Sequence, residues 1–133
     1  MINGHIYDKR ARKRRILVVD DELRIVRFLR TSLSARGYEV ISATNGEEAL
    51  ELARVEQPDI MLLDLFLPVI DGFEVLRKLR SFSRLPVIAF SANDSARDRV
   101  LNLGANDFIA KPFAPDDLVK RIEAVLTGST ESD

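Results

Sequence analysis

Five polar residues stand where apolar, strand-like runs of this sequence stop, and their types suit a metal ion and a phosphoryl group. They are Asp20 and Asp21 after the run 16–19, Asp64 after 60–63, Ser91 after 87–90 and Lys111 after 108–110. Open parallel α/β sheets bind ligands at the carboxyl ends of their strands, so neighbouring strands would bring these side chains together. Two or three carboxylates suffice for Mg²⁺ when phosphate and water complete its shell, and a carboxylate can itself attack phosphorus. We therefore expect a metal-assisted phosphoryl-transfer site at one edge of a sheet.

The elements that would position these residues follow from two alternating periods. From residue 16 onward, short β-rich runs alternate with stretches of helical period, which predicts one doubly wound α/β domain with a five-stranded parallel sheet. Strands are expected at 16–19, 38–43, 59–63, 87–90 and 107–110, and helices at 22–36, 46–55, from the Asp71–Gly72 turn to about 80, at 95–103 and from 115 onward. The apolar stripe of the helix 95–103 is thin, which predicts weak docking of that helix.

Composition and charge narrow the class of protein. The 133 residues make about one domain, the chain has no cysteine, and its apolar runs are too short to span a bilayer, so we expect a cytoplasmic protein without a membrane partner. Residues 1–15 carry six basic side chains against one acidic side chain, whereas the rest is acidic. We divide the chain into a basic arm (1–15), a folded domain (16–126) and a polar tail (127–133). The arm is either a solvated leader or a nucleic-acid contact.

Four motifs in this order resemble the receiver domains of two-component response regulators. They are the acidic-pair strand Ile16–Glu22, the phosphoacceptor loop Leu63–Gly72, the hydroxyl strand Phe90–Ala92 and the Lys-Pro segment Gly104–Phe113. Each motif alone is weak, but the four together at successive strand ends are specific. The resemblance covers about residues 16–126 and implies the flavodoxin-like strand order 2-1-3-4-5 with five helices.

The resemblance implies a role for each carboxylate of the cluster. Asp64 would accept a phosphoryl group from the phosphohistidine of a sensor histidine kinase or a phosphotransfer protein. Asp21, Asp64 and the backbone carbonyl of Phe66 would bind Mg²⁺ (or Mn²⁺) directly, and Asp20 would act mainly through water. Asp20 and Asp21 could instead only cap the helix that follows.

The resemblance also assigns the residues that hold and report the phosphoryl group. Ser91 and Lys111 would grip its oxygens, and the Lys111–Pro112 bond would be cis. The movement of Ser91 would be followed by Phe108, whose ring turns inward and remodels the surface made by the fourth helix, the fifth strand and the fifth helix. The alternative is that Phe108 is simply a core residue.

Two further expectations concern dimerisation and phosphate lifetime. The same surface resembles the dimer face of regulators linked to winged-helix DNA-binding domains, with matching charges at Arg97, Asp107, Asp117 and Arg121. Asn106 departs from that pattern, and any DNA binding would need the basic arm or an output domain outside this sequence. Phe66 and Asn93 occupy positions that influence phosphate lifetime, and Phe66, which cannot orient water, predicts slow self-dephosphorylation.

Three alternatives to a self-phosphorylating receiver stay open. A metal-dependent phosphohydrolase would use the same aspartates on an external substrate, but it needs a general acid two residues beyond its nucleophile, where Phe66 stands. A phosphate-independent interaction module would not need particular residue types at the five polar positions. Nucleic-acid binding through the arm would add to the receiver function rather than replace it.

Overall fold

Five parallel strands form one sheet in the computed structural model of the protein, which describes residues 13–128. Across the sheet, the strands are β2 (Glu39–Ala43), β1 (Arg15–Val19), β3 (Ile60–Asp64), β4 (Val87–Ser91) and β5 (Asp107–Ala110). The order 2-1-3-4-5 confirms the predicted doubly wound fold. All residues of the central strands β3 and β4 are buried, as expected for strands covered on both faces.

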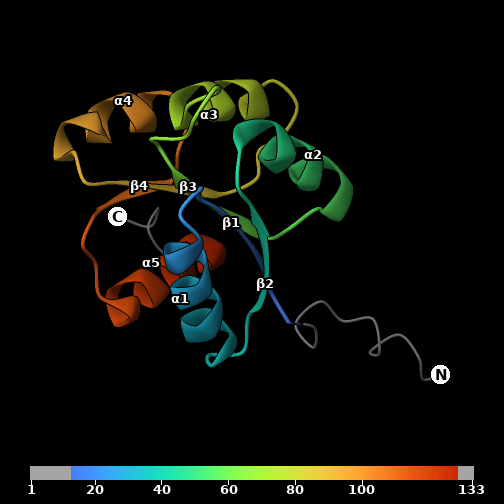
Figure 1. Cartoon of the computed structure of the whole chain (residues 1–133), viewed down its shortest axis with the longest axis vertical. Coiled ribbons are helices and arrows are strands. Elements are labelled where there is room, and N and C mark those ends of the chain that lie inside the picture. The colour runs from blue at the N-terminus through green and yellow to red at the C-terminus, as the bar shows by residue number, and fades with distance from the viewer. Residues whose placement is uncertain (1–12, 129–133) are drawn as a thin grey trace.

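Helices cover both faces of the sheet (Figure 1), with α1 (Leu23–Ser34) and α5 (Pro115–Thr127) on one face and α2 (Gly46–Glu56), α3 (Gly72–Arg80) and α4 (Arg97–Asn102) on the other. The period of two along each strand divides the core accordingly. In β1, for example, Ile16 and Val18 pack on the side of α1 and α5, whereas Leu17 and Val19 pack on the side of the other three helices.

The element boundaries differ from the predicted ones by one or two residues. β1 begins at Arg15, which the sequence analysis placed in the basic arm, because its backbone pairs with Glu39 and its N–H donates to the Asp59 carboxylate at 2.7 Å. Three other basic residues of the arm, Lys9, Arg10 and Arg12, lie outside the described residues. No helix within residues 13–128 is long and apolar enough to cross a membrane.

The fourth helix departs most from its prediction. The expected helix 95–103 is split into a 3-10 turn at Asp94–Ala96 and the short helix α4. Of its thin apolar stripe, Ala96 and Val100 are buried and Leu103 is only partly buried. The apolar area that holds α4 on the sheet is therefore small, and the weak docking of this helix stays a prediction.

The loop after β3 depends on Gly72, the first residue of α3. A Cβ atom at this position would lie 2.6 Å from the Asp64 carbonyl oxygen and 2.6 Å from the Leu65 Cα atom. The side chain of Asp71 caps the helix by accepting a hydrogen bond from the Glu74 N–H at 3.0 Å. This close approach of α3 to the end of β3 keeps the Asp64 backbone in place.

Candidate functional site: an acidic notch at the carboxyl ends of the strands

Three aspartates meet at the carboxyl ends of β1 and β3. One carboxylate oxygen from each of Asp20, Asp21 and Asp64 lies within 4.8 Å of the other two. Asp20 is fully buried, Asp64 is 4 % exposed and Asp21 is exposed to solvent. The side chains come together because β1 and β3 are adjacent and in register, with Val19 beside Leu63.

Lys111 brings one positive charge to these carboxylates. Its Nζ atom lies 3.8 Å from Asp20 Oδ2 and 3.7 Å from Asp64 Oδ1. The same ammonium lies 5.1 Å from the centre of the Phe90 ring. The Lys111–Pro112 peptide bond is cis. One cation is thus shared between two buried carboxylates, and the third carboxylate faces solvent.

The electrostatics of the notch favour the uptake of further positive charge. Burial, and secondly the neighbouring Asp20 charge, raise the pKa of Asp64 to about 6, against the opposing effect of Lys111. Burial likewise raises the pKa of Asp20. Both shifts mean that ionising these carboxylates costs free energy that a bound cation would offset.

The donor set of the notch fits a magnesium ion. Asp20 Oδ1 accepts a hydrogen bond from the Glu22 N–H at 2.9 Å, whereas the buried Asp20 Oδ2 accepts none from the described residues. Two buried carboxylates and one exposed carboxylate offer hard oxygen ligands with room for water, as Mg²⁺ prefers. The Phe66 N–H donates a hydrogen bond to Asp64 Oδ1 at 3.4 Å, and the Phe66 residue is 58 % exposed. The role of the Phe66 carbonyl as a ligand stays a prediction.

Ser91 is the last residue of β4 and is fully buried. Its Oγ atom accepts a hydrogen bond from the Asn93 N–H at 2.9 Å, and its backbone carbonyl accepts one from the Lys111 N–H at 2.9 Å. The second bond ties Ser91 directly to Lys111. The hydroxyl and the ammonium thus stand on adjacent chain segments at the same edge of the sheet as the aspartates.

The four residues expected on a dimer face lie on α4, β5 and α5, and their charges are paired within the chain. Arg121 lies 3.2 Å from Asp107 and 3.8 Å from Asp117, and Arg97 lies 2.9 Å from Asp94. The sequence analysis assigned the four expected residues to a dimer face. It did not predict the contact of Arg97 with Asp94 or the pairing of these charges within one chain. The i,i+3 spacing of Asp94 and Arg97 was a usable signal for the Asp94 contact.

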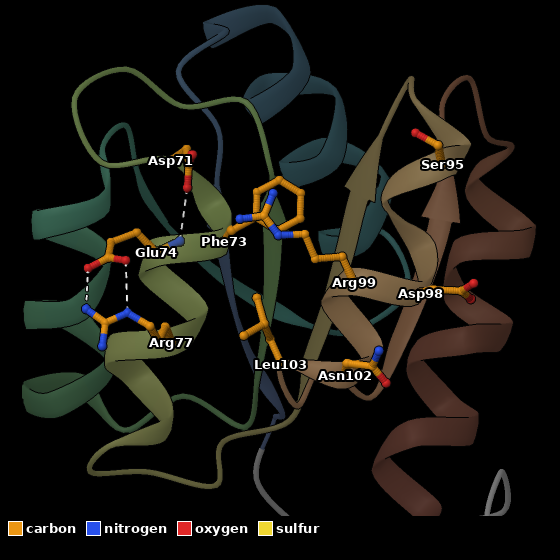
Figure 2. Close-up of a pocket in the computed structure, with 9 residues that line it drawn as sticks. All are labelled: Asp71, Phe73, Glu74, Arg77, Ser95, Asp98, Arg99, Asn102 and Leu103. Carbon is orange, nitrogen blue, oxygen red and sulfur yellow. Dashed lines mark hydrogen bonds and ion pairs between the residues drawn. The ribbon is translucent and has the colours of Figure 1, made fainter.

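A groove of about 640 Å³ lies between α3 and α4, and the sequence analysis did not predict it (Figure 2). In it the Arg99 guanidinium stacks on the Phe73 ring at 3.8 Å, and Arg77 pairs with Glu74. Both charge signs line the groove, with Asp98 on its α4 side. No local sequence pattern predicts this contact, because Phe73 and Arg99 belong to different helices.

Comparison with known proteins identifies the family. The model of the response regulator receiver domain matches residues 16–123. The chain belongs to this family. It is 44% identical over 119 residues to the alkaline phosphatase synthesis transcriptional regulatory protein PhoP of Bacillus subtilis, covering 87% of this chain and 50% of that protein. It is 45% identical over 122 residues to the response regulator MprA of Mycolicibacterium vanbaalenii, covering 90% of this chain and 53% of that protein.

Solved receiver structures agree with the fold. A CheY-like response regulator receiver domain protein from Methanospirillum hungatei superposes with a TM-score of 0.82 at 31% identity, covering 91% of this chain and 99% of that one. The chain spans about half the length of its curated relatives. The predicted family is thereby confirmed, and it is a family of receiver domains rather than of catalytic enzymes.

Proposed function

We propose that this receiver domain accepts a phosphoryl group on Asp64 in a Mg²⁺-dependent reaction and changes the α4–β5–α5 surface in response. The observation that carries the proposal is the buried Asp64 carboxylate, whose pKa is about 6, with Lys111 at 3.7 Å and two further aspartates within 4.8 Å. The carboxylate that would act as nucleophile, the ammonium and the carboxylates that would bind the metal therefore lie close together at one edge of the sheet.

The reaction divides among the residues of the notch. An Asp64 oxygen attacks phosphorus of a phosphohistidine on a sensor kinase or phosphotransfer protein, the new O–P bond forms, and the P–N bond to the imidazole breaks. The ammonium of Lys111 and the hydroxyl of Ser91 hold equatorial oxygens, where phosphoryl transfer needs charge stabilised. Asp20, Asp21 and Asp64, with the Phe66 carbonyl, would hold Mg²⁺, which neutralises negative charge on the transferred group when bound.

Phosphorylation would be read out through Ser91 and Phe108. Phe108 pairs with Ala89 of β4, and its ring is already fully buried in this structure, so the inward turn expected from the resemblance is not needed to reach that position. Moving the Ser91 hydroxyl toward a phosphoryl group removes its hydrogen bond from the Asn93 N–H and frees the loop that leads into α4. The small apolar contact of α4 makes this segment inexpensive to move.

Mass analysis after treatment with acetyl phosphate and Mg²⁺ tests the chemistry. We expect one phosphoryl group on the wild type and on Asp98→Asn, which removes an exposed aspartate of α4, and none on Asp64→Asn. Phosphate on Asp64→Asn at the wild-type level would refute the assignment. Sustained release of phosphate from an external ester would instead favour the phosphohydrolase, against which the apolar Phe66 argues.

We propose in addition that phosphorylation promotes a homodimer through Arg97, Asp107, Asp117 and Arg121. The pairing of these charges within one chain supports a surface in which they can exchange partners across a two-fold axis. Sedimentation with and without a phosphoryl mimic tests this, and a monomer under both conditions would count against it. Any DNA binding would come from the basic arm or from an output domain; one relative is named a transcriptional regulatory protein.

A further inference from the structure

Two arginines hold the Phe108 peptide from outside the sheet. The Arg97 guanidinium carbon lies 4.9 Å from the centre of the Phe108 ring, and Arg97 Nη1 donates to the Phe108 carbonyl at 3.4 Å. Arg121 Nη1 donates to the same carbonyl at 2.9 Å. A carbonyl oxygen has two lone pairs, so the two donors use its full capacity. Because β5 is the edge strand, these side chains replace the neighbouring strand that β5 lacks.

Arg97 is itself anchored to the loop that follows Ser91. Its Nη2 atom donates to Asp94 Oδ1 at 2.9 Å. Asp94 adjoins Asn93, whose N–H donates to the Ser91 hydroxyl at 2.9 Å. A continuous line of contacts thus runs from the Ser91 hydroxyl through the loop and Arg97 to the Phe108 ring.

We propose that Arg97 is a positioning residue that holds the Phe108 ring in the buried position it has in this structure and couples the loop after Ser91 to β5. This inference rests on the proposed function, in which Phe108 reports the phosphorylation of Asp64. Arg97 acts in two ways, because its charge faces the ring and its N–H groups bind the peptide of the same residue. The resting position of Phe108 is therefore set by α4 and not only by the core.

The same helix offers a matched control. Arg99, two residues after Arg97, stacks at 3.8 Å on the Phe73 ring of α3 instead (Figure 2). Arg97→Ala and Arg99→Ala each remove one guanidinium and one cation–π contact from α4. Only the first removes the contact with Phe108. A general loosening of α4 would affect both variants.

The test is ¹⁹F NMR of the whole chain carrying 4-fluorophenylalanine at its seven phenylalanines. The Phe108 resonance is assigned with Phe108→Leu, and its exposure to water is measured from the difference in chemical shift between H₂O and D₂O. The sample contains EDTA and no phosphoryl donor, so the result does not depend on phosphorylation. Urea unfolding of each variant checks that it is folded.

We expect the population of conformers with an exposed Phe108 ring to rise about fivefold in Arg97→Ala, the effect of losing about 1 kcal/mol from a partly exposed cation–π contact. Arg97→Lys keeps the charge without the planar fork and should recover part of the burial. Asp94→Asn, which frees Arg97 from its anchor, should give a smaller rise in exposure, and this variant decides the matter if Arg97→Ala does not fold.

Two results would overturn the inference. One is a Phe108 resonance that does not differ between the wild type and the folded Arg97 or Asp94 variants. The other is an equal change in Arg99→Ala. Phosphorylation by acetyl phosphate, followed separately by mass, shows whether the proposed function itself fails. If Asp64 takes up no phosphate, the proposed function is wrong, but the NMR experiment still tests whether Arg97 positions Phe108.

Discussion

Replacing Asp64 by Asn should stabilise the fold at neutral pH when no divalent cation is present. The pKa of Asp64 is raised from its ordinary 3.8 to about 6 in the folded chain, chiefly by burial and then by Asp20. The folded state therefore binds more protons than the unfolded state between these two values. The corresponding contribution to stability is complete below pH 3.8 and is lost as pH rises through about 6.

The size of this effect follows from the shift in the pKa. A shift of about 2 units at about 1.4 kcal/mol per unit corresponds to roughly 3 kcal/mol. Asn keeps an oxygen that can accept from the Phe66 N–H but carries no charge, so Asp64→Asn avoids this cost at pH 7.5. We expect a gain of about 2–3 kcal/mol at pH 7.5 and almost none at pH 3.5.

Urea unfolding in EDTA at both pH values measures the difference between the wild type and Asp64→Asn. Asp98→Asn makes the same change in net charge at an exposed position and should stay within about 0.5 kcal/mol of the wild type. Mg²⁺ at ten times its Kd should add about 1.4 kcal/mol to the wild type and much less to Asp64→Asn. A wild type as stable as Asp64→Asn at pH 7.5 in EDTA would refute the electrostatic reasoning.

Three more substitutions test other parts of the loop after β3. Val69, with φ of 67° and a side chain 99 % exposed, is a β-branched residue in the left-handed region, so Val69→Gly should raise the free energy of unfolding by about 0.5–1 kcal/mol after the entropy cost of glycine. A loss of stability in urea would show that no strain is relieved. Gly72→Ala places a Cβ 2.6 Å from the Asp64 carbonyl and should cost about 1–3 kcal/mol and slow phosphorylation by acetyl phosphate, whereas an unchanged rate would contradict the close approach. Phe66→Asn introduces a group that can orient water and should speed the loss of phosphate from Asp64, measured by mass over time, and a slower loss would overturn the expectation.

Much of the fold could be predicted from the sequence because its signals are local. Most strands are short continuous apolar runs that are buried on both faces of the sheet, and the longer helices repeat apolar residues at a period of 3.6 that matches their buried faces. The site residues were found for a related reason, since they stand at the ends of such runs. Pro115 at the start of α5 and Asp71 before α3 were equally local signals.

Only the tertiary structure decided the pKa of the site carboxylates and the contacts between side chains of distant segments. The raised pKa of Asp64 depends on how deeply β3 is covered and on the distance to Asp20, which follows the neighbouring strand β1. The contact of Arg97 with Phe108 and that of Arg99 with Phe73 join segments separated by a turn or by a whole strand. Burial and electrostatic interaction depend on distances in space, and no sequence pattern states how closely two distant segments approach.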